Sequence, residues 1–402
     1  MLCLKPYSAF VLLLLLISCK NHEIQKQEKY RTIEYNKDFF DYSRDYSKVV
    51  KHLDLIPLET NANCLIGEIT QIIEKNGLYY IFDRHMSQTL FIFDSVGNFV
   101  IKIHEKGKGP RETIRPMFMA MDDYKNELVL CSDAPPKILV YDARGIFKRE
   151  IPVPWPITAI EVLDSGSYVV RNNGQENQIC IIDKQGNSIK HIHSYNPLIN
   201  SITYKDFTRF GDKVLYHKDN VDTIYQITTK GLQPWIYVDY KENKVTQKHL
   251  NEMILAQKKL HRPIGLPLNV INGTEFYSES PDIIYFTFTI ANAEGHRPFI
   301  RLFHCKNTNH TIYFPLVNRN HPQYFGKYRL FEMASMYMNT NSRGEFISER
   351  DAVDIIEIID DIKSLINEGL VTVLGSNSAS RLLELNEQSN PVLAKFTFND
   401  HF

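Results

Sequence analysis

The chain has 402 residues, of which 43% are hydrophobic and 23% are charged, and its formal net charge is −1 at pH 7. A balance so close to zero gives no electrostatic basis for binding nucleic acid, which requires an excess of Lys and Arg over acidic residues. The composition is that of an ordinary globular protein, and its 22 Tyr and 23 Phe favour strands over helices.

Residues 1–18 have the features of a lipoprotein signal peptide. An apolar run over residues 9–17 is too short to span a bilayer but has the length of a signal-peptide core. The run leads into the letters LISC at residues 16–19, which resemble the lipobox of bacterial lipoproteins. The resemblance implies cleavage before Cys19 and attachment of lipid to its sulfur, so that acyl chains anchor the protein to a membrane. The alternative is an ordinary secretory signal followed by an incidental cysteine.

Residues 19–52 are expected to form a lipidated N-terminal tether. The segment begins with the polar residues Lys20 to Glu23 and has the composition of a flexible chain to about Asn36. Lys20 follows the cysteine, so the usual Asp signal for retention in the inner membrane is missing. The expected location is therefore the cell envelope, with the lipid anchor in the outer membrane. The sequence leaves the membrane leaflet open.

The stretch from Gly77 to Glu112 provides the pattern that organises the rest of the chain. It contains three strand-like runs, Leu78–Phe82, Thr89–Phe93 and Phe99–Ile103, with an Asp-x-x-Gly turn at residues 94–97 before the third. The same turn recurs, with a degraded last copy, at residues 142–145, 183–186 and 228–231. A spacing of roughly 40 to 50 residues is typical of four-stranded propeller blades. The alternative is a set of unrelated hairpins in a sandwich.

Six pairs of strands can be counted along the chain, so we predict an all-β fold, a six-bladed β-propeller over residues 53–402. The inner strands are expected near Ile66–Ile73, Met117–Met121, Thr158–Leu163, Ile202–Phe210, Asn269–Phe276 and Leu330–Tyr337. The second strands are expected at Leu78–Phe82, Glu127–Cys131, Ser167–Arg171, Lys213–His217, Ile283–Phe288 and Glu345–Ser348. The ring is expected to close by pairing the two ends of the domain, Leu53–Leu58 and Val392–Phe398.

Two short helical insertions interrupt the strand pattern. Thr246–Leu260 and Asp351–Glu368 carry apolar residues at helical spacing, and Gly369 supplies a stop signal after the second. Either helix could be a lid over the central opening or could pack on the outside of the ring. The sequence does not decide between these two arrangements.

Three marks support a family resemblance: residues 91–99, the exit Gly107-x-Gly109-Pro110-x-Glu112 and the terminal Asn390-Pro391. With them, the chain resembles the six-bladed β-propeller lipoproteins of Gram-negative gut-type bacteria, relatives of the NHL-repeat propellers, over almost everything after Cys19. The family pattern favours Gly at the position of Arg111, so the backbone could differ there. The resemblance implies the fold and the location, and it implies no chemistry.

The loops that follow the second strands are expected to gather at one end of the ring and to form a polar rim. Acids, bases and amides alternating around a rigid scaffold suit a polar ligand such as a glycan, a peptide or an envelope protein. Polar residues also end strands for structural reasons, and Asp83 and Asp133 could simply cap turns. The candidate ligand-binding residues are Asp83, Arg84, Asp133, Arg171, Asn172, His217, Asp219, Glu349 and Arg350.

The alternative function is a propeller enzyme, a hydrolase or lyase with carboxylates at the central funnel. Asp83, Asp133, Asp219 or Glu349 could supply paired acids, or could bind calcium together with Asn172. No G-x-S-x-G, H-E-x-x-H or Walker sequence supports catalysis. The sequence therefore leaves the enzyme question open and favours a binding or scaffolding module.

No cofactor or metal site is predicted from the cysteines. Those beyond the lipobox form no C-x-x-C pair, and most of them lie within apolar runs where burial is the default. An oxidising envelope would permit a disulfide, but the sequence does not say which residues would pair. These cysteines are Cys64, Cys131, Cys180 and Cys305.

Overall fold

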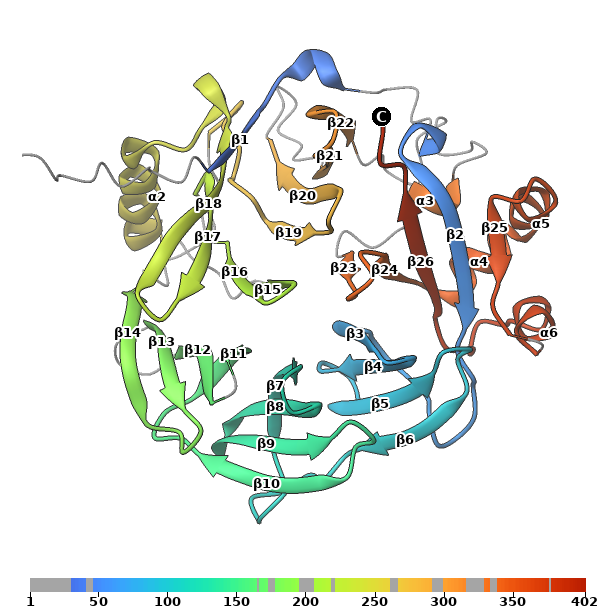
Figure 1. The fold of residues 1–402 in the computed structure, drawn as a ribbon, viewed down its shortest axis with the longest axis horizontal. Helices are drawn as coiled ribbons and strands as arrows, with labels where there is room; N and C mark the ends of the chain where they lie inside the picture. Colours follow the sequence, from blue (N-terminus) through green and yellow to red (C-terminus); the bar gives the residue numbers. More distant parts are fainter. Residues whose placement is uncertain are drawn as a thin grey trace, which may run out of the picture. The chain divides into compact units, whose positions relative to one another are not determined.

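The computed structural model describes residues 30–40, 46–164, 166–172, 178–194, 206–217, 221–260, 267–290, 299–315, 329–332, 338–375 and 377–402. Residues 32–402 form one compact unit. In this unit, six sheets of four or five strands are arranged in a ring (Figure 1). The prediction of an all-β, six-bladed propeller is confirmed.

The first three blades are four-stranded meanders of consecutive strands. Blade 1 consists of β3 (Gln71–Lys75), β4 (Leu78–Asp83), β5 (Thr89–Asp94) and β6 (Phe99–Ile103). Blade 2 consists of β7 (Arg115–Asp122), β8 (Glu127–Ala134), β9 (Pro136–Asp142) and β10 (Phe147–Pro152). Blade 3 consists of β11 (Ile157–Asp164), β12 (Ser167–Asn172), β13 (Gln178–Asp183) and β14 (Ser188–Ser194).

Blades 4 and 5 follow the same plan, with one strand added to blade 4. Blade 4 consists of β15 (Phe207–Phe210), β16 (Lys213–Tyr216), β17 (Thr223–Thr228) and β18 (Gly231–Asp239), with β1 (Arg31–Glu34) beside β18. Blade 5 consists of β19 (Phe276–Glu279), β20 (Ile283–Thr289), β21 (Phe299–Cys305) and β22 (His310–Pro315).

Blade 6 joins the two ends of the domain. It is ordered β23 (Asn339–Thr340), β24 (Phe346–Arg350), β26 (Val392–Phe398), β2 (Val50–Pro57) and β25 (Val371–Val373). β2 and β26 pair antiparallel from Val50 opposite Phe398 to Pro57 opposite Val392. β26, the last strand of the chain, lies between β24 and β2. The predicted pairing of the two ends of the domain, which closes the ring, is therefore confirmed.

The Asp-x-x-Gly turns shape the outer hairpins as the sequence predicts. In the turn of blade 1, Asp94 Oδ1 accepts hydrogen bonds from the backbone N–H groups of Val96 and Asn98, at 3.0 and 2.8 Å. Gly97 adopts a φ of +81°, which disfavours residues with a Cβ atom. A Cβ at Gly97 would also lie 2.5 Å from the carbonyl oxygen of Pro57, so the turn packs closely on blade 6.

Neighbouring blades pack face to face through apolar side chains. Between blades 1 and 2, Phe82 and Ile92 are buried with Met119 and Leu130 in one cluster. Burying such a side chain contributes about 1.5–3 kcal/mol, so these contacts hold the blades together. Hydrogen bonds also link the inner strands; the Gln71 side chain bonds both the N–H and the carbonyl of Met119.

The second strands lie close to their predicted positions, whereas several inner strands do not. The expected inner strand Leu330–Tyr337 is wrong at its start, because α3 (Arg329–Glu332) is a short helix, and the inner strand of blade 6 is β23. Residues 333–337 of that expected strand lie outside the described residues. Leu330 and Phe331 are buried, and a short buried apolar run does not by itself distinguish a strand from a helix. β3 and β19 lie several residues later than expected, and residues 202–205 of the fourth expected strand fall outside the described residues.

The helical insertions lie on the outside of the ring rather than over its middle (Figure 1). α2 (Gln247–Leu260) confirms the first insertion and lies beside the outer strands of blade 4. The second insertion is two helices, α4 (Ala352–Glu357) and α5 (Ile359–Asn367), because the chain departs from helical geometry at Ile358; α6 (Ser378–Leu383) follows. Ile355, Ile362 and Leu365 are buried in one cluster with Leu53 of β2. This packing against β2 explains why α4 and α5 lie on the outside of the ring.

Part of the segment expected to be a tether belongs to the fold. β1 lies in blade 4, and Tyr46 is buried with its ring stacked on Phe314 at a centroid distance of 4.3 Å. Among the described residues, no helix is both long enough and apolar enough to cross a membrane.

Candidate functional site

The ring has two ends, which the hairpins define. In blade 1, Lys75 at the end of β3 pairs with Leu78 at the start of β4, whereas Gln71 at the start of β3 pairs with Phe82. The inner-strand end is therefore the end at which β3, β7, β11, β15, β19 and β23 finish. The second-strand end is the opposite one, at which β4, β8, β12, β16, β20 and β24 finish. The predicted rim belongs to the second-strand end.

Asp83, at the end of β4, is fully buried and binds the backbone of two connections. Its Oδ2 accepts a hydrogen bond from Gly67 N at 2.9 Å, and its Oδ1 accepts one from Met86 N at 3.0 Å. The neighbouring Arg84 guanidinium lies over the ring of Phe118 in blade 2, 4.9 Å from its centroid. Asp83 therefore caps the connections around it, as the structural alternative expected.

Arg171 and Asn172, at the end of β12, are both buried. Arg171 Nη1 donates to both carboxylate oxygens of Asp206, at 2.8 and 3.0 Å, and the two side chains are only 5% and 6% exposed. Asp206 lies immediately before β15, so this ion pair joins blades 3 and 4.

The other rim residues also have partners in the fold. Asp133 accepts a hydrogen bond from Arg115 Nε at 2.6 Å, and the buried His217 donates from Nε2 to the carbonyl of Glu275 at 3.2 Å. Arg350 is buried; its Nη1 donates to Ser348 Oγ at 3.0 Å and to the carbonyl of Glu349. Asp219 lies outside the described residues.

A cavity of about 330 Å³ lies at the second-strand end. Glu349 lines it together with Glu68 and Asp351, and the other described rim residues are not in its lining. The structure therefore does not bring the predicted rim together around one cavity. Whether its members bind a ligand remains a prediction.

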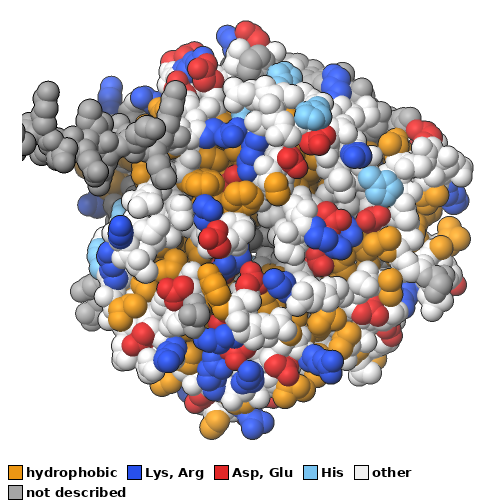
Figure 2. Space-filling model, in the orientation of Figure 1, with side chains coloured by type: hydrophobic (Ala, Val, Ile, Leu, Met, Phe, Trp, Pro, Cys, Tyr) orange, Lys and Arg blue, Asp and Glu red, His pale blue; other side chains and the backbone are white. Residues whose placement is uncertain are grey.

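A larger cavity, of about 480 Å³, occupies the inner-strand end, and every blade contributes to it. Its size is within the range of small-molecule sites. Figure 2 shows Lys and Arg side chains interspersed with Asp and Glu side chains around the hollow in the middle of the face in view. The lining residues are Gln71–Lys75, Met121, Asp123, Glu161, Arg209–Gly211, Glu279–Pro281, Asn339–Ser342 and Gly344.

Two ion pairs in the wall of this cavity join neighbouring blades. Lys75 Nζ lies 2.8 Å from Asp123 Oδ1, and Arg209 Nη2 lies 3.0 Å from Glu161 Oε1. Burial acts to lower the pKa of Arg209, but the charge and hydrogen bonds of Glu161 outweigh burial and raise it. Arg209 is therefore a fixed cation at neutral pH.

Glu74 forms a third charged group of the wall, between blades 1 and 6. Its Oε2 accepts a hydrogen bond from Asn341 Nδ2 and lies 3.4 Å from Arg343 Nη2. The Nε of Arg343 lies 2.9 Å from Glu345 Oε2. The Glu74 side chain is almost completely buried, whereas the Arg343 side chain is 61% exposed.

Glu279, at the end of β19, is the fourth carboxylate of the wall. Its Oε2 accepts hydrogen bonds from Trp235 Nε1, at 2.8 Å, and from the hydroxyl of Tyr277, and its Oε1 is paired with Lys306 Nζ. The Lys306 ammonium lies 4.3 Å from the ring centroid of Phe210, which also lines the cavity. An aromatic ring thus stands beside the charged groups.

The sequence reasoning missed these four carboxylates, Glu74, Asp123, Glu161 and Glu279. A usable signal exists, because each lies within or directly after the second half of an inner strand. Aligning the hairpins between inner and second strands would have placed them at the same end of the ring.

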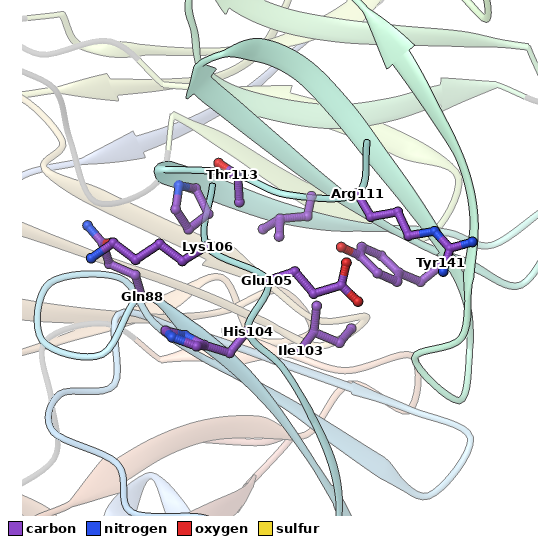
Figure 3. Close-up of a pocket in the computed structure, with 10 residues that line it drawn as sticks. Gln88, Ile103, His104, Glu105, Lys106, Arg111, Thr113 and Tyr141 are labelled. Atoms are coloured by element: carbon purple, nitrogen blue, oxygen red, sulfur yellow. The ribbon is translucent and has the colours of Figure 1, made fainter. Parts of the chain in front are cut away.

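A third space lies beside the glycine-rich exit of blade 1 and is too small for a ligand. Figure 3 shows it between His104, Lys106, Arg111 and Tyr141, and its volume is about 10 Å³, room for a single water.

The glycine-rich exit itself has a structural explanation. Glu112 Oε2 accepts a hydrogen bond from Gly109 N at 2.9 Å, and a Cβ at Gly107 would lie 1.9 Å from the same oxygen. Arg111 has a φ of +69°, so it keeps the left-handed backbone that suits the glycine of the family pattern.

Within the described part of the chain, no group of three or more His, Cys, Asp or Glu side chains is placed to hold a metal ion. The cysteines of the propeller are free and buried: Cys64, Cys131, Cys180 and Cys305. Burial raises the pKa of Cys131 to about 12, so its thiol is protonated at neutral pH.

Comparisons with known proteins agree with this architecture. The family model described as "Domain of unknown function (DUF4934)" matches residues 29–397, so the chain belongs to that family. A Bacteroides fragilis protein described as exported has a similar structure, with a TM-score of 0.67 and 18% sequence identity, covering 92% of this chain and 100% of that one. A DUF4221 family member from Bacteroides vulgatus has a TM-score of 0.46 and 11% identity, covering 87% of this chain and 97% of its own. No curated protein matches the chain.

Proposed function

We propose that this DUF4934 propeller is a lipid-anchored protein of the cell envelope, in the outer membrane, that binds a polar ligand in the inner-strand cavity. It acts as a binding or scaffolding module. The observation that carries the proposal is that all six blades place side chains around one cavity of about 480 Å³. A rigid frame with a few fixed polar groups is what ligand recognition requires.

The anchor rests on the LISC ending of the apolar run at residues 9–17 and on the resemblance to propeller lipoproteins. The similar structure described as exported is in keeping with it. Metabolic labelling with a palmitate analogue tests the anchor. We expect the wild-type chain to be labelled and to fractionate with membranes, and Cys19→Ala to lose both properties. A Cys19→Ala variant that still labels contradicts the anchor.

Binding is preferred to catalysis because each described carboxylate of the cavity wall is already ion-paired. A general acid or nucleophile needs a carboxylate that is available to the reacting atoms. Of the four candidates of the alternative hydrolase or lyase, Asp83 and Asp133 bind backbone N–H groups and Arg115 respectively. Glu349 lines the smaller cavity at the other end of the ring, and Asp219 lies outside the described residues. The inner-strand cavity is therefore assigned to recognition.

A thermal-shift screen with a library of neutral sugars, uronic acids, amino acids and short peptides tests the site. Binders are expected to raise the melting temperature, because they stabilise the folded state by mass action. Ser342→Trp places a large side chain at an exposed position of the cavity lining and is expected to abolish the shift.

Gln185→Trp is the matched control for this screen. Gln185 lies exposed in the outer hairpin turn of blade 3, and its backbone N–H, which the substitution keeps, binds Asp183. We expect this variant to retain the thermal shift. Binders that shift both variants equally would place the site elsewhere and overturn the proposal. Conversion of a bound library member, followed by mass spectrometry, would favour the enzyme alternative.

A further inference from the structure

The charged groups around the inner-strand cavity form complete pairs. The four lining carboxylates, Glu74, Asp123, Glu161 and Glu279, have as partners Arg343, Lys75, Arg209 and Lys306, respectively. Arg343 also pairs with Glu345, which in turn lies 3.5 Å from Lys395 Nζ. Each lining carboxylate therefore already has a cation beside it, and none is left to attract a cationic ligand by itself.

An ionic ligand would have to compete with these pairs. A carboxylate of the ligand that binds Arg209 must share it with Glu161, and an ammonium that binds Asp123 must share it with Lys75. Separating a pair leaves the other member without its partner, which is costly where the group is buried. This arrangement disfavours both anions and cations.

A neutral ligand rich in hydroxyl groups fits the pairs without separating them. Each hydroxyl can donate to a carboxylate oxygen and can accept from a guanidinium or ammonium N–H. The lining also includes the amide side chain of Asn339 at blade 6. Hydrogen bonds to charged groups are stronger than those between neutral groups, so the pairs are good partners for hydroxyls.

The apolar part of the lining suits the other side of such a ligand. Phe210 is half-buried and Pro281 is exposed, and both present carbon surface among the polar groups. A sugar ring has hydroxyls at its edge and C–H groups on its faces, and therefore matches a wall of both kinds.

We propose that the inner-strand cavity recognises a neutral oligosaccharide, and not a charged peptide or a uronic-acid glycan. This inference rests on the proposed function, because it names the ligand class of the same site. It predicts that binding depends little on ionic strength, since no net charge is neutralised when the ligand binds.

Isothermal titration calorimetry with the full-length chain tests the inference. The neutral probes are linear oligosaccharides of glucose, mannose, xylose and N-acetylglucosamine; the charged probes are oligogalacturonate, trilysine and triglutamate. We expect at least one neutral probe to bind, and its affinity to change less than about twofold when salt is raised from about 50 to about 500 mM. The charged probes are not expected to bind.

Two variants connect the binding to the cavity. Phe210→Ala is expected to weaken the neutral probe by about tenfold, because the apolar face is lost. Asp123→Asn leaves Lys75 unpaired at the most exposed of the four carboxylates. It is expected to weaken the neutral probe by about three- to tenfold, because a charge-assisted hydrogen bond to a hydroxyl becomes a neutral one, and to create weak, salt-sensitive binding of oligogalacturonate. Circular dichroism confirms folding, and Asp123→Asn carries the test if Phe210→Ala does not fold.

The outcomes separate this inference from the proposed function. Binding of charged probes alone, with a steep salt dependence and loss in Ser342→Trp, overturns the neutral oligosaccharide but leaves a polar ligand in the cavity. If none of the seven probes binds, the oligosaccharide inference fails, and the library screen decides the proposed function by itself. A neutral probe that binds Asp123→Asn and Ser342→Trp as it binds the wild type overturns both.

Discussion

The two ends of the ring use polar side chains in different ways. At the second-strand end, Asp83, Arg171 and Arg350 are buried, and they bind backbone groups or side chains of the fold. At the inner-strand end, Glu161 and Arg209 are also paired, but they form the wall of a cavity of about 480 Å³. Polar residues occur at both ends, but only at the inner-strand end do all six blades place them around one cavity.

The connections explain this difference. The turn between β3 and β4 has only Asn76 and Gly77, both with positive φ, and needs no side chain from the strands to complete it. The longer connections at the other end carry backbone N–H groups that require acceptors, and Asp83 supplies them for Gly67 and Met86. The β3–β4 hairpin therefore leaves the side chains at the end of β3 available to the cavity, whereas the longer connections beside β4 occupy Asp83.

The largest effect on stability is expected from a deletion that opens the ring, on which both ends depend. Deleting Val392–Phe398 removes β26, which pairs with both β24 and β2 in blade 6. The ring then has no closing strand, and its apolar blade faces are exposed to water. We expect loss of the cooperative thermal transition and of near-ultraviolet circular dichroism. Removing only residues 401–402 is the control and is expected to lower the melting temperature slightly. A deletion that melts as the wild type does would contradict the closure.

The next effect concerns the second-strand end. Arg171→Ala leaves the Asp206 carboxylate buried without the guanidinium that neutralises it. Breaking such a pair typically costs about 3–5 kcal/mol, which chemical denaturation can measure. The double variant Arg171→Met/Asp206→Leu removes both charges and is expected to cost less than the single one. If Arg171→Ala is fully stable and instead weakens ligand binding, the rim predicted from the sequence is the binding surface.

The features that the sequence predicts well are those fixed by local chemistry. The Asp-x-x-Gly turns and the second strands are defined by residues close together in the chain, so their positions could be read directly. Leu330–Tyr337 failed because burial of Leu330 and Phe331 suits a helix as well as a strand. The helix breaks at Ile358, between α4 and α5, where the sequence has no glycine or proline, so the break could not be predicted from the sequence.

The candidate site was harder to predict because its pairs join distant parts of the chain. Glu74 and Arg343 are separated by 269 residues, and only closure of the ring brings them together. The sequence placed residues such as Asp83 at one end of the ring correctly, but it could not tell which were needed by the backbone. That depends on the path of the connections, which the strand pattern does not encode.

A smaller effect on stability is expected from an ion-paired carboxylate at the inner-strand end that does not line the cavity. Glu127, at the start of β8, is buried and paired with Lys148 and Arg149 of β10, outside the cavity lining. The hydrogen bond from Arg149 outweighs burial, and with Lys148 it lowers the pKa of Glu127 from 4.5 to about 2. The stabilisation is therefore complete above pH 4.5 and is lost as the pH falls through about 2.

Glu127→Gln tests this assignment. At pH 7 we expect it to lower the free energy of unfolding by about 1–3 kcal/mol, and the difference from wild type should shrink as the pH falls below about 4. Urea denaturation at a series of pH values measures it. Ligand binding at pH 7 is expected to be unchanged. A constant difference at all pH values would mean that the ion pairs do not stabilise the fold.

The smallest effect on stability is expected at Arg343, whose neighbours Ser342 and Gly344 line the inner-strand cavity, and it completes the comparison of the two ends. Arg343→Ala makes the same substitution as Arg171→Ala, but the Arg343 side chain is 61% exposed. Exposed ion pairs contribute about 0–1 kcal/mol, so the free energy of unfolding should change by no more than this.

The Arg343→Ala variant leaves Glu74 with its Asn341 hydrogen bond and without a cation, so the cavity gains one net negative charge. We therefore expect trilysine, which is not expected to bind the wild type, to bind this variant weakly at low salt in calorimetry, while a neutral ligand loses less than about threefold in affinity. If Arg343→Ala and Arg171→Ala lower the free energy of unfolding equally, the charged groups at both ends stabilise the fold in the same way. The proposal that the inner-strand cavity is the binding site would then be contradicted.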